Sequence, residues 1–161
     1  MTIKSFGEIP FVEATHYGKG HKKPISMVIL HYTAGGSMAG TVNYLAGPNS
    51  PKVSLHFIVN RKPNNKFPTG IVQMVSCADR AWHAGKSEWQ GQKWLNSISC
   101  GIEICNWGPL TKKGNRFLNW AGSKYSSRYQ EPEFIDGKYW EPYSDFQYET
   151  VATLCAMLMD K

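Results

Sequence analysis

The sequence predicts an α/β protein, a single domain in which a central mixed β-sheet is flanked by helices. Two observations predict this class. The elements follow the order strand, helix, three strands, helix, and the first strand is a nearly continuous apolar run, as in a buried parallel strand. The chain has 161 residues, the length of one domain. In such sheets the chemistry gathers just beyond the strand ends, so a functional site is expected near His31, where the first strand ends.

Four strands and a first helix are expected before residue 108. Gly35-Gly36 breaks the chain after the first strand, and Gly47-Pro48 ends the first helix. The third strand follows a turn and is expected to form a hairpin with the second. The expected strands span residues 25–32, 53–60, 71–75 and 99–106, the first of them buried on both faces, and the helix carries Met38, Val42 and Leu45 on one side.

The last helix is expected to begin after Ser144, because Ser144 and Gln147 have the spacing of a capping box. Its buried face would carry Val151, Leu154, Cys155 and Leu158. Residues 108–143, which contain four glycines and three prolines, are expected to form a long functional or mobile loop.

Composition excludes several classes of protein. Hydrophobic residues make up 42% of the chain, too many for a disordered protein. No apolar run approaches the ~20 residues that a membrane-spanning helix needs. The N-terminus lacks the apolar segment of a signal peptide, so the chain is expected to be cytoplasmic as synthesised.

The chain is basic, with a formal net charge of +6. Residues 111–128 contain five cations and no acid. Such a stretch is either a solvated surface or a patch that attracts a polyanion such as nucleic acid, anionic lipid or cell wall. No nucleic-acid-binding motif is present, so nucleic acid is not expected as a partner.

The four cysteines show no CxxC spacing, which argues against a zinc knuckle or a redox motif. Cys100 and Cys105 lie in one expected strand an odd number of positions apart. They should therefore point to opposite faces and remain unpaired.

Two polar residues interrupt otherwise apolar strands. His31 is either a structural histidine bonded to a backbone carbonyl or a metal ligand at the mouth of a cleft. Glu103 is the only acid between Glu88 and Glu131. It is either an edge-strand residue facing water or an acid/base with a raised pKa. Gly101 on the same face would leave room for a ligand.

A third cluster lies at residues 80–85, Arg-Ala-Trp-His-Ala-Gly, followed by Trp94 and Asn96. An apolar plate beside hydrogen-bond donors suits a sugar ring or a peptide, whereas core filling is the other role open to the tryptophans. His56 could reach the same cleft, and His16 and His21 are expected to face solvent.

Taken in order, four motifs carry a resemblance: Leu-His-Tyr-Thr-Ala at 30–34, Ser-Leu-His-Phe at 54–57, the cluster at 80–85, and Asn-Ser-Ile-Ser-Cys-Gly-Ile-Glu-Ile-Cys-Asn at 96–106. Together they resemble the zinc-dependent N-acetylmuramoyl-L-alanine amidases of the amidase-2 family, which includes peptidoglycan recognition proteins and phage endolysins. The resemblance covers residues 25–161 and leaves 1–24 as an N-terminal extension.

The resemblance implies an amidase-2-like fold and a peptidoglycan hydrolase. Such an enzyme cleaves the amide between N-acetylmuramic acid and the L-alanine of the stem peptide with zinc-activated water. It implies His31 as a Zn²⁺ ligand and Glu103 as the catalytic carboxylate. The residues implied to line the muropeptide groove are Arg80, Trp82, His83, Ala84, Gly85, Trp94 and Asn96.

The chain departs from the family in two places. Family members take their remaining zinc ligands from a segment after the last helix, and this chain ends at Lys161, so we expect a truncated chain without those ligands. Trp94 stands where some members have an arginine, which leaves the stem-peptide type open. The resemblance favours a phage or prophage endolysin that acts on the wall after release; a non-catalytic peptidoglycan-binding module is the alternative.

Overall fold

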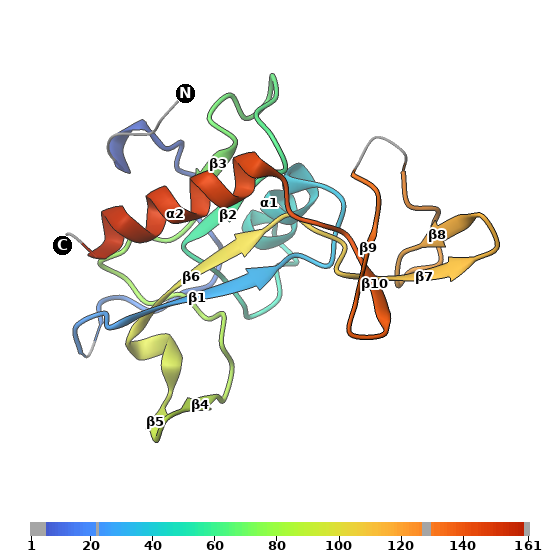
Figure 1. The fold of residues 1–161 in the computed structure, drawn as a ribbon. Helices are drawn as coiled ribbons and strands as arrows, with labels where there is room; N and C mark the ends of the chain where they lie inside the picture. Colours follow the sequence, from blue (N-terminus) through green and yellow to red (C-terminus); the bar gives the residue numbers. More distant parts are fainter. Residues whose placement is uncertain (1–5, 22, 127–129, 160–161) are drawn as a thin grey trace.

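The computed structural model describes residues 6–21, 23–126 and 130–159. Its central sheet has the order β1–β6–β2–β3 (Figure 1). β1 (Met27–Tyr32) and β2 (Phe57–Val59) run parallel to β6 (Ser99–Ile104), while β3 (Ile71–Gln73) is antiparallel to β2. The predicted mixed sheet and the predicted hairpin of β2 and β3 are both confirmed.

The two predicted helices cover opposite faces of this sheet. α1 (Met38–Ala46) packs against Ile58 and Val72, and α2 (Asp145–Met159) packs against Phe57 and Val59. Successive residues of a strand point to opposite faces, so β2 supplies both halves of the core. The predicted α/β architecture is therefore confirmed.

The strands differ from the prediction in burial and length. β1 is an edge strand, and Leu30 within it is 50% exposed, so the expected burial on both faces was wrong. The apolar residues of β1 therefore lie on one face that packs against the protein and on another face that is partly exposed to solvent. β2 and β3 are three residues each, shorter than the apolar patterns around them.

The predicted start of α2 is confirmed in detail. Ser144 Oγ accepts a hydrogen bond from the Gln147 amide at 3.3 Å, and Gln147 Oε1 accepts one from the Ser144 amide at 3.0 Å. This reciprocal pair is a capping box. Gln147 Nε2 also donates to the Cys105 carbonyl at 2.8 Å, which ties the helix to the end of β6.

The long loop expected at 108–143 was wrong, because the described part of this segment forms a second sheet, the insert sheet. Its strand order is β8–β7–β10–β9, and it lies beside the C-terminal ends of β1 and β6 (Figure 1). Asp136-Gly137, with positive φ at both residues, makes one of its tight turns. The strands are β7 (Pro109–Lys113), β8 (Arg116–Leu118), β9 (Glu133–Ile135) and β10 (Lys138–Trp140).

Three small elements complete the described fold. β4 (Glu88–Trp89) and β5 (Gln92–Lys93) form a hairpin, and the 3-10 helix η2 (Leu95–Ser97) follows it. A first 3-10 helix, η1 (Phe6–Glu8), begins the N-terminal segment. None of the helices in the described ranges has the length and apolar character to cross a membrane.

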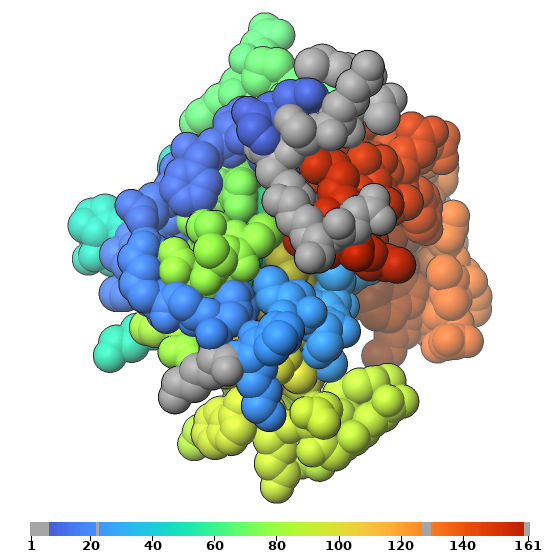
Figure 2. All heavy atoms as spheres, turned by 90° about the vertical axis from the view of Figure 1, so that its left-hand side faces the viewer, coloured from blue at the N-terminus to red at the C-terminus, as the bar shows by residue number. Residues whose placement is uncertain are grey.

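The described N-terminal residues, expected as an extension, pack onto the domain. Ile9 and Ala14 are buried, and the Ala14 amide donates to the Met74 carbonyl at 2.9 Å. Figure 2 shows this segment as a blue band against the green residues that follow β3. His16 stacks on Trp82 at 6.3 Å between ring centroids, which corrects its expected solvent-facing position.

His21 also departs from its expected place in solvent. Its Nδ1 lies 3.3 Å from the Ser97 carbonyl, and its ring stacks on His56. The cysteine prediction is confirmed, because none of the four cysteines forms a disulfide and Cys100 and Cys105 lie in cores on opposite faces of the sheet.

Candidate functional site

The candidate site lies where β1 and β6 run side by side. His31 of β1 and Glu103 of β6 are directly paired in the parallel register, so their side chains share one face. Glu103 and His83 line a hollow of about 490 Å³, the glycine-loop hollow. Residues 33–37, which follow β1, are called the glycine loop here, and all of them except Ala34 form part of the wall. The rest of the wall comes from one side of α1 and from residues 53–55.

A chain of hydrogen bonds fixes the histidines of this hollow. The Ser99 hydroxyl donates to the Leu95 carbonyl at 2.6 Å, which leaves its oxygen to accept from His83 Nε2 at 3.1 Å. His83 Nδ1 is then the acceptor for His31 Nε2 at 3.0 Å. His31 is therefore partnered by an imidazole, not by the backbone carbonyl that a purely structural role predicted. Its free lone pair lies on Nδ1.

His83 occupies the space that Gly101 provides. A Cβ atom at Gly101 would lie 2.6 Å from Cγ of His83, well inside van der Waals contact. The space directly over Gly101 is thus filled by the His83 ring, and the room for a ligand beside Glu103 is the glycine-loop hollow. Burial, together with the nearby His56 and His31, lowers the pKa of His83 to about 3, so this ring stays neutral.

Glu103 sits in a central strand, which rules out the water-facing edge position. Burial raises the pKa of its carboxyl to about 7. Burial likewise lowers the pKa of His31. A carboxyl that titrates near neutral pH can both accept and return a proton, which is what general acid/base chemistry requires.

His56 lies outside the hollow, contrary to the expectation that it reaches the cleft. It is fully buried; the Gly101 amide donates to its Nδ1 at 3.0 Å, and its Nε2 donates to the Asp79 carbonyl at 3.1 Å. Both ring nitrogens are satisfied by backbone, so His56 supports the fold.

A second hollow, of about 600 Å³, is lined by other residues of the 80–85 segment; we call it the cationic hollow. It gathers most of the predicted groove residues and three cations. Asn96 supports the wall as well, because its Oδ1 accepts from the amides of His83 at 3.0 Å and Ala84 at 2.7 Å. The relevant lining residues are Lys23, Arg80, Trp82, Gly85, Lys93, Trp94 and Asn96.

The described residues do not provide a complete metal site. Within residues 6–21, 23–126 and 130–159, no three His, Cys, Asp or Glu side chains are grouped to hold a metal ion. A catalytic zinc takes three protein ligands. His31 can offer one nitrogen, and the nearest imidazole, His83, is already committed to hydrogen bonds with His31 and Ser99.

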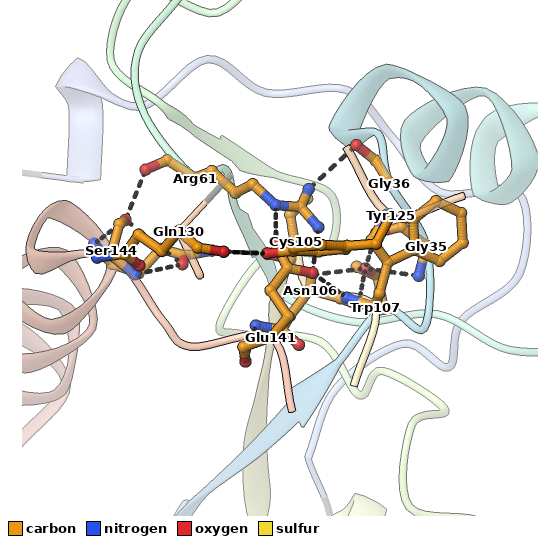
Figure 3. A network of polar contacts seen from close by, with 12 residues as sticks. Gly35, Gly36, Arg61, Cys105, Asn106, Trp107, Tyr125, Gln130, Glu141 and Ser144 are labelled. Carbon is orange, nitrogen blue, oxygen red and sulfur yellow. Dashed lines mark hydrogen bonds and ion pairs between the residues drawn. The ribbon is translucent and has the colours of Figure 1, made fainter. Parts of the chain in front are cut away.

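A network that no sequence motif indicates holds the glycine loop. The Arg61 guanidinium forms a bidentate ion pair with Glu141, and Arg61 Nη1 donates to the Gly36 carbonyl at 3.0 Å (Figure 3). Glu141 also accepts from the Trp107 amide at 2.5 Å. Arg61 and Glu141 are 80 positions apart, so no local sequence pattern indicates their pairing.

Comparison with known proteins places this arrangement in a family. The family model described as N-acetylmuramoyl-L-alanine amidase matches residues 21–161. N-acetylmuramoyl-L-alanine amidase AmiD of Escherichia coli is 38% identical over 96 residues, which are 58% of this chain and 33% of that protein. The 1,6-anhydro-N-acetylmuramyl-L-alanine amidase AmpD of Haemophilus influenzae is 29% identical over 112 residues, 58% of this chain and 56% of that one.

Solved structures agree on the fold. E. coli AmiD in complex with the substrate anhydro-N-acetylmuramic acid-L-Ala-D-gamma-Glu-L-Lys has a TM-score of 0.57 and 27% identity, over 84% of this chain and 43% of that one. An AmpD structure reaches 0.63 at 20% identity, over 99% and 79%. The aligned regions span about a third to just over half of the two curated relatives. With the family model matching most of its length, the chain belongs to the N-acetylmuramoyl-L-alanine amidase family, amidase-2.

Proposed function

We propose that this protein hydrolyses the amide between N-acetylmuramic acid and the L-alanine of the peptidoglycan stem peptide. The observation that carries the proposal is Glu103, a half-buried carboxyl with a pKa near 7 that lines a hollow together with His83 and is paired with His31 across the sheet. Membership of the amidase family and the likeness to AmiD, solved with a muropeptide substrate, support the same reaction.

In the proposed reaction Glu103 handles the proton. Its carboxylate takes a proton from the attacking water and then passes that proton to the leaving amide nitrogen. The cations of the cationic hollow, Lys23, Arg80 and Lys93, would hold the carboxylates of the stem peptide.

Zinc is the cofactor generally associated with this family. We propose His31 as a zinc ligand, and we assign no step to the metal because the described donor set is incomplete. Zinc content measured by mass spectrometry tests this assignment. We expect weak zinc retention by the present chain and still less by His31→Ala; equal zinc in both would make His31 a structural residue.

Release of soluble muropeptides from purified peptidoglycan tests the reaction, with zinc added. In a form of the protein that carries a full set of zinc ligands, we expect Glu103→Gln to lower the rate by at least ~10²-fold, the effect of losing a general base. Glu133→Gln, a change of an exposed glutamate on β9, is the matched control. Near-normal turnover by Glu103→Gln in a protein that hydrolyses peptidoglycan would reject the role of Glu103.

Our second candidate is a peptidoglycan-binding module without catalysis. The incomplete metal-binding group among the described residues favours it. It predicts sedimentation with insoluble peptidoglycan and no muropeptide release at any zinc concentration. A phage or prophage endolysin, made in the cytoplasm and acting on the wall after release, remains the cellular role that we propose from the sequence resemblance.

A further inference from the structure

An exposed aromatic residue stands beside the glycine-loop hollow. Trp120, in the loop after β8, is 71% exposed, although tryptophan usually buries most of its large ring. Its Nε1 donates to the Ala34 carbonyl at 2.6 Å. The polar edge of the indole is therefore anchored, and much of the ring remains open to solvent.

The turn that carries Trp120 is rigid. Asn119 is buried, and its Oδ1 accepts from the amides of Ala121 at 3.1 Å and Ser123 at 2.9 Å. The Gly122 amide closes the turn on the Asn119 carbonyl at 2.9 Å. An aromatic side chain held in this way loses little conformational freedom when a ligand covers it.

Trp120 is joined to the wall of the hollow that contains Glu103. Its hydrogen-bond partner, Ala34, lies between Thr33 and Gly35, and both of these line the hollow. The glycine loop is itself held in place. Arg61 Nη1 donates to the Gly36 carbonyl, and the Gly35 amide donates to the Asn106 carbonyl at 3.2 Å. The Trp120 ring therefore stands at the rim of the proposed active site.

The two hollows differ in charge. Apart from Glu103 and His83, the glycine-loop hollow is lined by glycine, hydroxyl-bearing and apolar side chains, whereas the cationic hollow has Lys23, Arg80 and Lys93. In muropeptides the stem peptide carries the carboxylates, and the sugar rings carry neutral hydroxyl and acetamido groups. Neutral rings suit the first hollow and carboxylates the second.

We propose that Trp120 is a sugar-binding residue, which stacks on a hexosamine ring of the glycan strand while the stem peptide lies toward the cationic hollow. This inference rests on the proposed function. It adds the orientation of the substrate, with the glycan strand at Trp120 and the stem peptide at the cationic hollow. Stacking on an exposed aromatic ring requires only a flat apolar sugar face, so the contact accepts successive sugars of a strand.

The test compares two ligands in the Glu103→Gln background, so that neither is cleaved. One is N-acetylglucosaminyl-N-acetylmuramyl pentapeptide, and the other is the free pentapeptide. By calorimetry we expect Trp120→Ala to weaken the disaccharide ligand about 3- to 10-fold and to leave the pentapeptide unchanged. Trp120→Phe, which keeps a ring but loses the bond to Ala34, should retain most of the affinity.

Trp89→Ala is the matched control, because Trp89 is also exposed, at 63%, and lies on the β4–β5 hairpin. It should change neither affinity. Equal affinities of Trp120→Ala and its parent for the disaccharide ligand would overturn the inference, as would an equal loss for both ligands, which marks a role in holding the loop. If either result is obtained while the protein with Glu103 intact still hydrolyses peptidoglycan, the sugar-binding role of Trp120 fails and the proposed function stands. If neither ligand binds the Glu103→Gln parent, the sugar-binding role and the proposed function both fail.

Discussion

At the scale of single residues, the geometry of the site depends on Gly101, whose missing side chain leaves space for the His83 ring. His83 meets His31 because Gly101 of β6 has no side chain, and Ser99, two residues before Gly101 on the same strand, sets which nitrogen of His83 carries the proton. A catalytic arrangement of this kind depends on contacts that keep each ring in one orientation.

Gly101→Ala is predicted to lower the free energy of unfolding by about 1–3 kcal/mol, because its Cβ would overlap the His83 ring. Gly40→Ala is the control: a Cβ there meets only Ser37 atoms at 3.7 Å or beyond, so this change within α1 should be neutral or stabilising. Urea denaturation of both variants measures the difference, and equal stability would contradict the described packing around His83.

At the scale of elements, a polar network joins the insert sheet to the core. The Asn106 side chain donates to the Glu141 carbonyl at 3.0 Å, and the Gly108 amide donates to Asn106 Oδ1 at 2.7 Å. With the pair of Arg61 and Glu141, these bonds join both ends of the insert sheet to the glycine loop (Figure 3). The insert is thereby held in a fixed position beside the hollow.

Glu141→Gln is predicted to destabilise the protein by about 3–5 kcal/mol, because it removes the buried carboxylate charge that forms the bidentate pair with the half-buried Arg61 guanidinium. Glu88→Gln removes an exposed partner of Lys93, at 3.7 Å, and should have little effect. Thermal unfolding of the two variants tests this. Similar small shifts of Tm for both would show that the Arg61–Glu141 pair contributes no more than a surface ion pair.

At the scale of the whole molecule, the central sheet separates two hydrophobic cores. The protein also contains three buried or half-buried imidazoles, those of His31, His56 and His83. Burial lowers the pKa of His56 to about 4, against an ordinary value of 6.5. The folded protein therefore resists protonation that the unfolded chain accepts, and this difference makes stability depend on pH.

Between pH 6.5 and about 4 the unfolded state binds more protons at His56 than the folded state does, so the free energy of unfolding should fall as the pH falls. Urea denaturation at pH 7.5, 6, 5 and 4 measures the slope. His56→Asn loses its backbone hydrogen bonds and should be less stable at pH 7.5 but less sensitive to acid. Parallel pH profiles for the two proteins would contradict a buried neutral His56.

The sequence by itself determined the features that depend on near neighbours. The period of Met38, Val42 and Leu45 marked α1, the Ser144–Gln147 spacing marked the start of α2, and Glu103 stood out as an acid within an apolar strand. Caps and helix faces involve residues at most a few positions apart, so their signals survive in the linear chain.

Only the tertiary structure decided which distant residues meet. The pairing of Arg61 with Glu141, of His31 with His83, and of Trp120 with Ala34 each spans more than 50 positions. The insert sheet was missed although Asp136-Gly137 is a hairpin signal, because its strands have three to five residues and too little alternation to be recognised. Such contacts follow from how the elements pack, and packing is a property of the whole chain.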